Sequence, residues 1–421
     1  MTLDRRRFTG LMAGLAGALA LPRRPNADPG ELPSFVARLE PMTAGVEPIS
    51  DAERAARREQ ARRLMREQGL DGILLEPGSS MTYFTGVSWW PSERAFLALL
   101  PAGGEPIWIC PAFEEARARE ETGADADVRV WQEDEDPFAL VAGALREWGA
   151  VAGRVGIEER VRWFVSDGIR QAAPAATLGS ATPVTAGCRM YKSPAELALM
   201  QRANDVTMAA FRAVIPTLRE GMTQQQVASG MTAAMTKLGG EDPWALILFG
   251  AGSAFPHGTR EPHRLQPGDI VLMDCGCAVS GYQADITRTT VFGKPSARQR
   301  QVWELERRAQ DAAFKAAQVG VPCEAVDAAA RKVITDAGFG PGYRVPGLPH
   351  RTGHGIGLDG HEWTNFVRGN ATPIAPGMCF SDEPMIAIPG EFGVRLEDCL
   401  HITEQGPRFF TPQSESIERP L

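Results

Sequence analysis

Acidic residues inside otherwise apolar segments constrain the fold of this chain most strongly. Asp274 ends the run Ile-Val-Leu-Met, and Asp285 begins a second strand-like run that continues to about Phe292. The midpoint between the two aspartates falls beside Gly281, where we expect a turn. In such a hairpin the two carboxylates lie roughly opposite each other, with about 5 Å between their Cβ atoms.

A second acidic pair, Glu383 and Glu397, is placed symmetrically about Gly390, inside another expected turn. Four half-buried carboxylates cannot all stay ionised without compensation, because desolvation and mutual repulsion are both large. Pairing with Arg288 and Arg395 is one way to compensate the charge. Divalent cations are the other, and two facing pairs together with a histidine motif favour the cations.

The histidine motif is HRTGHGIGLDGHE, which runs from His350 to Glu362 between the two acidic pairs. Glycines surround His354, so that the backbone can come close to it. One imidazole and four carboxylates can hold two divalent ions with shared ligands, the arrangement of two-metal hydrolases. A donor set made mostly of oxygen favours Mn²⁺, with Zn²⁺, Co²⁺ or Fe²⁺ as alternatives.

The order and spacing of five motifs resemble those of the pita-bread metallopeptidases, which include aminopeptidase P, prolidase (Xaa-Pro dipeptidase) and methionine aminopeptidase. The resemblance implies an α+β fold, in which a pita-bread catalytic domain follows a smaller α/β domain of the creatinase type. It also implies a hydrolase of Xaa-Pro bonds in dipeptides or short peptides that holds two divalent ions. The motifs are MDCG with Asp274, DITRT with Asp285, TGHGIGL with His354, DEP with Glu383 and GVRLED with Glu397.

The same resemblance distributes the metal ligands. It implies that Asp285 and Glu397 bridge the two ions, and that Asp274 completes one site. His354 and Glu383 then complete the other site. A hydroxide held between the ions would be the nucleophile, and Glu383 would shuttle its proton to the leaving nitrogen.

Substrate contacts are also implied by the resemblance. His257 in FPHG and His361 in GHE match two histidines that do not bind metal but hold the substrate and stabilise the oxyanion. In many prolidases an arginine four residues after the equivalent of His361 accepts the free carboxylate of the dipeptide. Asn365 stands at that position here, so Arg368 is the substitute candidate. Arg395 is also expected to contact the substrate.

The patterns of strands and helices divide the chain into four parts. Residues 1–20 are predicted to be a twin-arginine signal peptide, because Arg5 to Arg7 precede Phe8 and a Gly/Ala/Leu stretch that is shorter than the ~20 residues of a membrane span. A basic tail that stays attached is the alternative. Residues 21–47 are predicted to be a linker, 48–188 the creatinase-like domain and 189–421 the catalytic domain. We therefore expect a periplasmic or secreted protein, without a stable membrane anchor after cleavage, that forms a homodimer.

Other classes of protein fit the sequence less well. The net charge of −8 argues against a nucleic-acid partner. The GxGxxG pattern at 355–360 follows a proline-containing segment rather than a strand, so a dinucleotide site is not predicted, and no GxSxG motif indicates a serine hydrolase. The seven cysteines include no CxxC pair and are expected to be buried core residues without a functional disulfide. A metal-dependent lyase or hydrolase of a non-peptide small molecule, built on the same scaffold, stays open.

Overall fold

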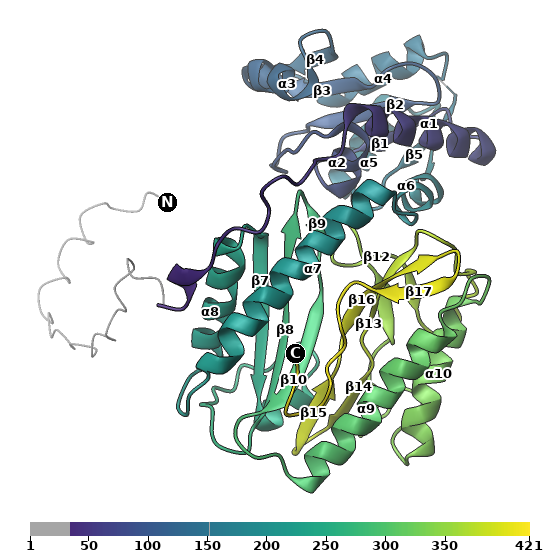
Figure 1. Cartoon of the computed structure of the whole chain (residues 1–421). Coiled ribbons are helices and arrows are strands. Elements are labelled where there is room, and N and C mark those ends of the chain that lie inside the picture. The colour runs from purple at the N-terminus through teal and green to yellow at the C-terminus, as the bar shows by residue number, and fades with distance from the viewer. Residues whose placement is uncertain (1–33, 151) are drawn as a thin grey trace, which may run out of the picture.

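The computed structural model describes residues 34–150 and 152–421, which form two domains (Figure 1). The predicted twin-arginine signal peptide and the first part of the predicted linker lie outside the described residues. Among the helices that are described, none is both long and apolar enough to cross a membrane.

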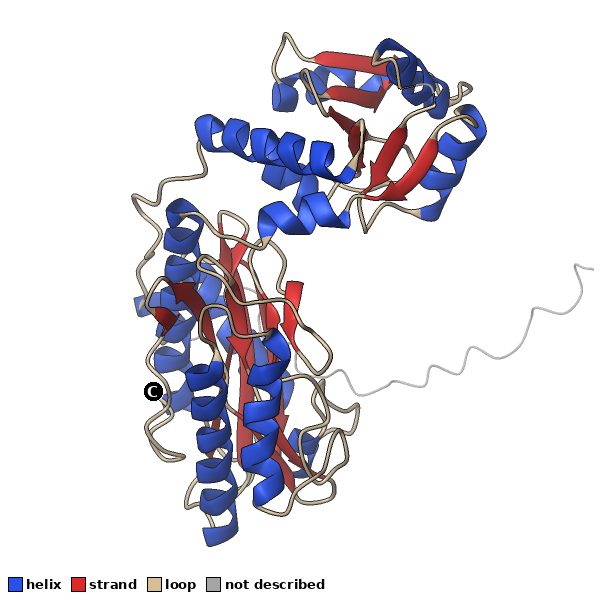
Figure 2. Ribbon diagram, turned by 90° about the vertical axis from the view of Figure 1, so that its right-hand side faces the viewer, coloured by secondary structure: helices blue, strands red, loops and turns tan. Residues whose placement is uncertain are grey.

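The N-terminal domain is a six-stranded mixed sheet with helices on both faces (Figure 2). The strand order is β4-β3-β2-β1-β5-β6, and apolar side chains of β1 enter the cores on both faces. The strands are β1 (Gly72–Leu75), β2 (Leu97–Pro101), β3 (Ile107–Pro111), β4 (Asp127–Trp131), β5 (Arg154–Ile157) and β6 (Thr177–Ser180). The helices are α1 (Asp51–Gln68), α2 (Ser79–Thr85), α3 (Glu115–Thr122), α4 (Pro137–Glu147), α5 (Trp163–Ala172) and α6 (Thr182–Arg189).

The C-terminal domain packs two helix pairs against antiparallel sheets. Its first helix begins at a capping box that Ser193 and Glu196 form. The helices are α7 (Pro194–Val214), α8 (Gln224–Lys237), α9 (Ala297–Ala316) and α10 (Cys323–Asp336). The strands are β7 (Glu241–Phe249), β8 (Ile270–Val279), β9 (Tyr282–Gln283), β10 (Ile286–Val291), β11 (Gly353–Gly355), β12 (Glu362–Phe366), β13 (Cys379–Asp382), β14 (Met385–Ile388), β15 (Phe392–Arg395), β16 (Asp398–Thr403) and β17 (Gly406–Phe409).

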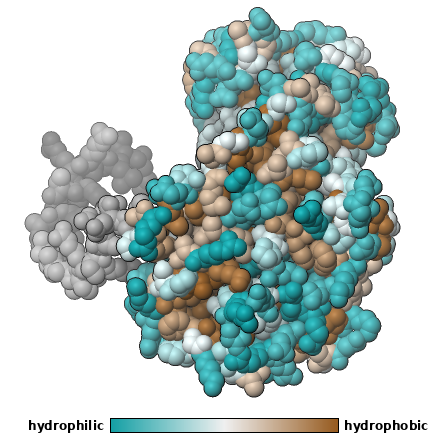
Figure 3. All heavy atoms as spheres, viewed as in Figure 1, coloured by the Kyte–Doolittle hydropathy of each residue, from teal (hydrophilic) through white to brown (hydrophobic). Residues whose placement is uncertain are grey.

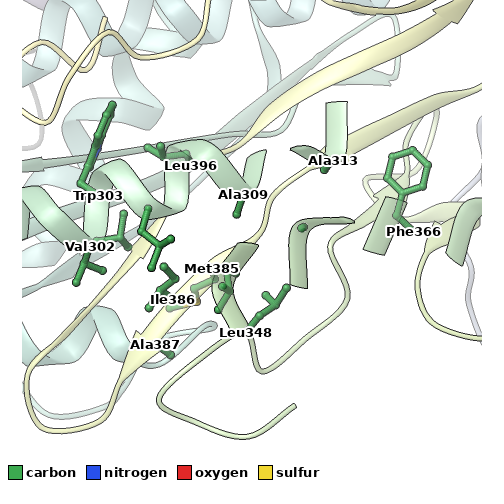
Figure 4. Close-up of a cluster of buried hydrophobic side chains, with 14 of the residues drawn as sticks. Val302, Trp303, Ala309, Ala313, Leu348, Phe366, Met385, Ile386, Ala387 and Leu396 are labelled. Carbon is green, nitrogen blue, oxygen red and sulfur yellow. The ribbon is translucent and has the colours of Figure 1, made fainter. Parts of the chain in front are cut away.

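The alternation of side chains along β8 separates the core from the site. Met273 and Cys275 belong to the core that covers the α7–α8 side, whereas Asp274 between them points to the opposite face. A second core lies between α9, α10 and strands β13 to β15, and Figure 4 shows Trp303 and Met385 within it. All seven cysteines are free thiols and are buried, as expected.

The first predicted hairpin forms, but its register differs from our expectation by one residue in the turn. Ser280 and Gly281 occupy the turn with φ values of 48° and 80°, which are typical of a two-residue hairpin turn. As a result Asp274 pairs with Thr287 rather than with Asp285. Asp285 lies two residues from Thr287 along the chain, so both aspartates still face the same side of the sheet.

The second predicted hairpin has the expected register. Met385 pairs with Arg395, and Asp382 pairs with Asp398. Glu383 and Glu397 lie between these two paired positions, in the same register, and therefore stand opposite each other. This prediction was correct because Gly390, with φ 82°, is the centre of the turn.

Part of the segment predicted to be a linker is packed against the catalytic domain. Residues 34–47 form a strap, which contains the short helix η1 (Val36–Arg38). The side chain of Val36 is fully buried in the core formed by α7 and α8, and the amide of Met42 donates to the carbonyl of Leu238. Phe35, Leu39 and Met42 are partly buried against the same core, and burial of these apolar side chains explains why the strap is held.

Candidate active site

The predicted site residues meet in one cavity of the C-terminal domain. Its volume is about 650 Å³, and strands β7, β8, β11, β15 and the loops beside them contribute to its wall. The hydrophobic part of the wall comes from Trp244 and Leu246 of β7. The polar part comes from His257, Asp274, Asp285, His350, Arg351, His354, His361, Glu383, Arg395 and Glu397.

The predicted metal ligands are close enough to share cations. His354 Nε2 lies 3.3 Å from Glu383 Oε1 and 3.6 Å from Asp285 Oδ2. Three groups of residues each offer ligand atoms within 4.8 Å of one another. The groups are Asp274, Asp285 and Glu397; His354, Glu383 and Glu397; and Asp285, His354 and His361. The first two groups together contain all five predicted ligands.

The state of the carboxylates fits a cation site. Asp274 Oδ1 and Asp285 Oδ1 are buried and have no hydrogen-bond partner among the described residues. Burial, and then the neighbouring carboxylates, raise the pKa of Asp285 and of Glu397 well above the ordinary value. Buried carboxylates that repel one another are stabilised by a cation. These residues could therefore hold divalent metal ions.

Arg395 and Thr287 connect the carboxylates through hydrogen bonds. The Arg395 side chain is almost fully buried and donates to Asp274, to Thr287 Oγ1 at 3.0 Å and to the carbonyl of Pro256 at 3.1 Å. Thr287 in turn donates to Glu397 Oε2 at 2.6 Å. One arginine therefore compensates part of the negative charge of four carboxylates, and the negative charge that is left is available to a cation. Although predicted to contact the substrate, Arg395 uses all three guanidinium nitrogens within the protein.

Arg288 has no part in this cavity. Its guanidinium forms an ion pair with Asp398 and donates to the carbonyls of Glu397 and Pro412 on the other side of β10. Arg288 and Thr287 are neighbours in a strand, so their side chains point to opposite faces. Compensation of the acidic pairs by Arg288, the alternative raised from the sequence, does not occur.

Glu383 has the properties of a proton carrier. Burial raises its pKa to about 7, while Arg395 and Ser381 act in the opposite direction. Ser381 Oγ donates to Glu383 Oε1 at 3.4 Å and accepts from the amide of His354 at 3.0 Å. A carboxyl group with a pKa near neutral pH can accept and release a proton during a reaction.

His361 is held next to His354 by Arg351. The two imidazole rings have centroids 3.9 Å apart, and Arg351 Nη2 lies 3.0 Å from His361 Nδ1. Because an arginine can only donate, Nδ1 of His361 accepts and the ring hydrogen lies on Nε2. Burial, followed by the charge of Arg351, lowers the pKa of His361. His361 is therefore a neutral hydrogen-bond donor exposed to the cavity, and His257 lines the same cavity.

Three residues of the site were missed by the sequence analysis. Thr287 was missed because the register of its hairpin was misplaced. His350 and Arg351 belong to the histidine motif, and their proximity to His354 in the sequence was the available signal. The Nε2 atom of His350 is buried and has no hydrogen-bond partner within residues 34–150 and 152–421, and burial lowers the pKa of His350 to about 3.

Arg368 is not brought to this cavity. It lines a separate hollow of about 740 Å³ next to Trp363 and Asn370, and its guanidinium lies over the ring of Tyr343. Asn365 lines a hollow of about 310 Å³ that also contains Arg351 and His361. Arg351 also lines the cavity of the predicted ligands, and none of the described carboxylates forms an ion pair with it. Among the described residues, Arg351 is therefore the unpaired cation next to the predicted ligand cluster.

Comparison with known proteins agrees with this geometry. Residues 198–404 match the model of metallopeptidase family M24, and residues 57–191 match the creatinase/prolidase N-terminal domain. The chain is 32% identical to the Xaa-Pro dipeptidase of Lactobacillus delbrueckii subsp. lactis, over 84% of this chain and 96% of the relative.

Solved structures resemble the whole two-domain arrangement. The dipeptidase PepE of Mycobacterium ulcerans is similar with a TM-score of 0.82 and 33% identity, covering 88% of this chain and 99% of that chain. The prolidase of Thermococcus sibiricus is similar with a TM-score of 0.78 and 28% identity, covering 86% of this chain and 98% of that chain.

Proposed function

The chain belongs to metallopeptidase family M24, and on that premise we propose that it cleaves the Xaa-Pro bond of dipeptides or short peptides with two divalent metal ions. The observation that carries the proposal is the cluster of four carboxylates around His354, in which Asp274 and Asp285 each have a buried oxygen without a hydrogen-bond partner in the described part of the chain. Mn²⁺ is the proposed metal, because the donors are mostly oxygen.

Five residues would hold the ions, with Asp285 and Glu397 shared between them. When bound, two divalent ions supply Lewis acidity and an activated water near neutral pH. Asp274, Asp285 and Glu397 have no other role in this proposal than to hold these charges. The five residues are Asp274, Asp285, His354, Glu383 and Glu397.

The remaining residues bind the substrate and move the proton. Glu383 would carry a proton to the leaving nitrogen, which is needed because an amide nitrogen must gain a proton to leave as an amine. The Nε2–H of His361 and the imidazole of His257 would donate to the oxygen that becomes negative in the transition state. Both histidines line the cavity from loops.

We propose that Arg351, and not Arg368, binds the free carboxylate of the dipeptide. Arg351 lines both the metal-ligand cavity and the adjacent hollow of about 310 Å³. Its guanidinium has no carboxylate partner among the described residues, and a planar guanidinium suits a carboxylate. A dipeptide held over the ligand cluster would therefore present its free end to Arg351.

Hydrolysis of a substrate panel tests the proposal. The full chain with Mn²⁺ is assayed on Xaa-Pro dipeptides, longer Xaa-Pro peptides, Xaa-Ala dipeptides, phosphotriesters and sulfonium acids. We expect turnover of Xaa-Pro dipeptides to exceed that of the matched Xaa-Ala dipeptides. Turnover of only the non-peptide compounds would replace the proposal by the alternative reading of the same scaffold.

The location and assembly of the protein are part of the proposal. We propose export by the twin-arginine route and a homodimer, on the basis of residues 1–20 and the resemblance to prolidases. Cell fractionation after expression with and without Arg5 and Arg6, and light scattering of the purified protein, test the two points. Retention of the intact chain in the cytoplasm in both cases would exclude export.

A further inference from the structure

The loop that presents His361 is held by side chains that come from outside its own sheet. It connects β11 to β12 and reaches the N-terminal domain, where hydrophobic side chains also gather at the seam between the two domains (Figure 3). Asp359 accepts hydrogen bonds from Ser79 Oγ at 2.5 Å, from Arg160 Nη1 at 2.8 Å and from Arg189 Nη2 at 2.6 Å. All three donors belong to the N-terminal domain.

Glu362, on the other side of His361, is held more deeply. Its carboxylate accepts from Lys192 Nζ at 2.9 Å and from Arg189, and also from the amide of Asp359 at 3.1 Å. Burial alone would raise the pKa of Glu362, but the charges of Lys192 and Arg189 outweigh it and lower the pKa to about 2. The carboxylate is therefore ionised at any pH at which the enzyme would work.

The four charged residues form what we call the brace: Arg189, Lys192, Asp359 and Glu362. The side chains of Lys192 and Arg189 are 1% and 7% exposed, and each of their carboxylate partners belongs to this one loop. Burying such ions costs free energy that their mutual attraction often does not recover. A net gain in stability is therefore a weak explanation for the brace, whereas fixing one conformation of the loop is a sufficient one.

His361 needs such a fixed loop. Its own side chain is exposed to the cavity, where it contacts only the side chains of His354 and Arg351 in the interactions described above. Asp359 and Glu362 anchor the backbone on the two sides of His361. A hydrogen-bond donor stabilises a transition state only when it is held in place before the reaction.

We propose that Arg189 and Lys192 are positioning residues that set His361 in place through Asp359 and Glu362, so that the end of the N-terminal domain and the segment that joins it to α7 complete the active site. This inference rests on the proposed function, because it gives His361 a role in Xaa-Pro hydrolysis. It adds a role for the N-terminal domain in the chemistry itself.

Lys192→Met in the full Mn²⁺-loaded chain tests the inference. A shift of about 1 Å in a catalytic group can cost on the order of 10²-fold in rate, so we expect a loss of that order in kcat. The KM and the bound metal should stay unchanged, and Lys192→Arg should recover most of the activity. Asp359→Asn, at a more exposed arm of the brace, serves as a second variant if Lys192→Met does not fold.

A cycle with His361→Ala separates positioning from a general structural effect. If Lys192 acts through His361, Lys192→Met should not lower kcat further in the His361→Ala background. Arg57→Met is the matched control, because Arg57 joins α1 to Tyr282 Oη at 3.0 Å across the same domain interface and lies outside the cavity. We expect Arg57→Met to lower the melting temperature and leave kcat unchanged. Equal, additive losses in both backgrounds would overturn the inference.

Hydrogen exchange of the loop gives a readout that does not require turnover. We expect Lys192→Met, but not Arg57→Met, to speed amide exchange in peptides that cover 356–366. Unchanged exchange in Lys192→Met would overturn the inference even if Xaa-Pro hydrolysis is intact. If the wild-type protein hydrolyses no Xaa-Pro substrate but Lys192→Met still speeds exchange in this loop, the brace is supported and only the proposed function is rejected.

Discussion

The imidazole rings of His354 and His361 lie against each other, with 3.9 Å between their centroids and 34° between their planes. His354 is buried among the carboxylates, whereas His361 is exposed to the cavity. Distances alone would also allow His361 to join Asp285 and His354 around an ion. In the proposed function the two roles are separate: His354 holds metal, and His361 donates to the substrate oxygen.

The first prediction concerns this separation. His361→Ala should lower kcat by about 10²–10³-fold, the effect of one lost oxyanion donor, with little change in KM. Metal content, measured by elemental analysis, should stay at the wild-type level. His263→Ala, which changes a histidine paired with Asp269 outside the cavity, is the control. A matching loss of metal in His361→Ala would make His361 a ligand instead.

The second prediction separates Arg351 from Arg368. Arg351→Gln should raise KM for Xaa-Pro dipeptides by about tenfold or more, because a charged hydrogen bond contributes roughly 1.5–3 kcal/mol. The same substitution should change KM little for Xaa-Pro amides, which lack the free carboxylate. Arg368→Gln should leave both values near wild type, since Arg368 lines another hollow. Steady-state kinetics on the two substrate types measure these values. A raised KM for the dipeptide in Arg368→Gln, but not in Arg351→Gln, would reverse the assignment.

The third prediction concerns protons released on metal binding. Asp285 and Glu397 have raised pKa values in the metal-free site, so they retain protons at a pH where ordinary carboxyls are ionised. His354 is already neutral, because burial lowers its pKa well below the ordinary value. Binding of Mn²⁺ should therefore release protons from carboxyl groups, and its affinity should rise with pH. Calorimetric titrations in two buffers of different ionisation enthalpy measure the release, and buffer-independent heats would argue against it.

The fourth prediction concerns the strap at 34–47. Val36→Ala removes buried contacts between the strap and the α7–α8 core, and should lower the free energy of unfolding by about 2 kcal/mol. Glu40→Ala changes an exposed residue of the same strap and should have no comparable effect. Urea unfolding monitored by fluorescence measures both. Equal midpoints for Val36→Ala and wild type would mean that the strap does not stabilise the catalytic domain in solution.

Much of the catalytic domain could be predicted because its signals are local. The Ser-x-x-Glu capping box of Ser193 and Glu196 marks the start of α7, and the glycine turn at Gly390 fixes the opposition of Glu383 and Glu397. The first hairpin was misplaced because its midpoint was inferred from the two aspartates. The turn residues Ser280 and Gly281, which can adopt positive φ, decide the register instead.

Contacts between distant segments could not be predicted in the same way. Thr287 and Glu397 are far apart in the sequence, and only the packing of two hairpins brings their hydrogen bond about. The pairing of Arg189 with Glu362 crosses from one domain to the other. No periodicity or motif in one chain indicates which charged residue of one domain will meet which of the other.

Metal dependence tests the central claim most directly. The full chain is stripped of metal by chelation, Mn²⁺ is added back in steps, and bound metal and Xaa-Pro hydrolysis are measured on the same samples. We predict no hydrolysis without metal and full recovery at two Mn²⁺ per chain, with Asp285→Asn recovering neither binding nor activity. Undiminished hydrolysis by the metal-free protein would contradict the account.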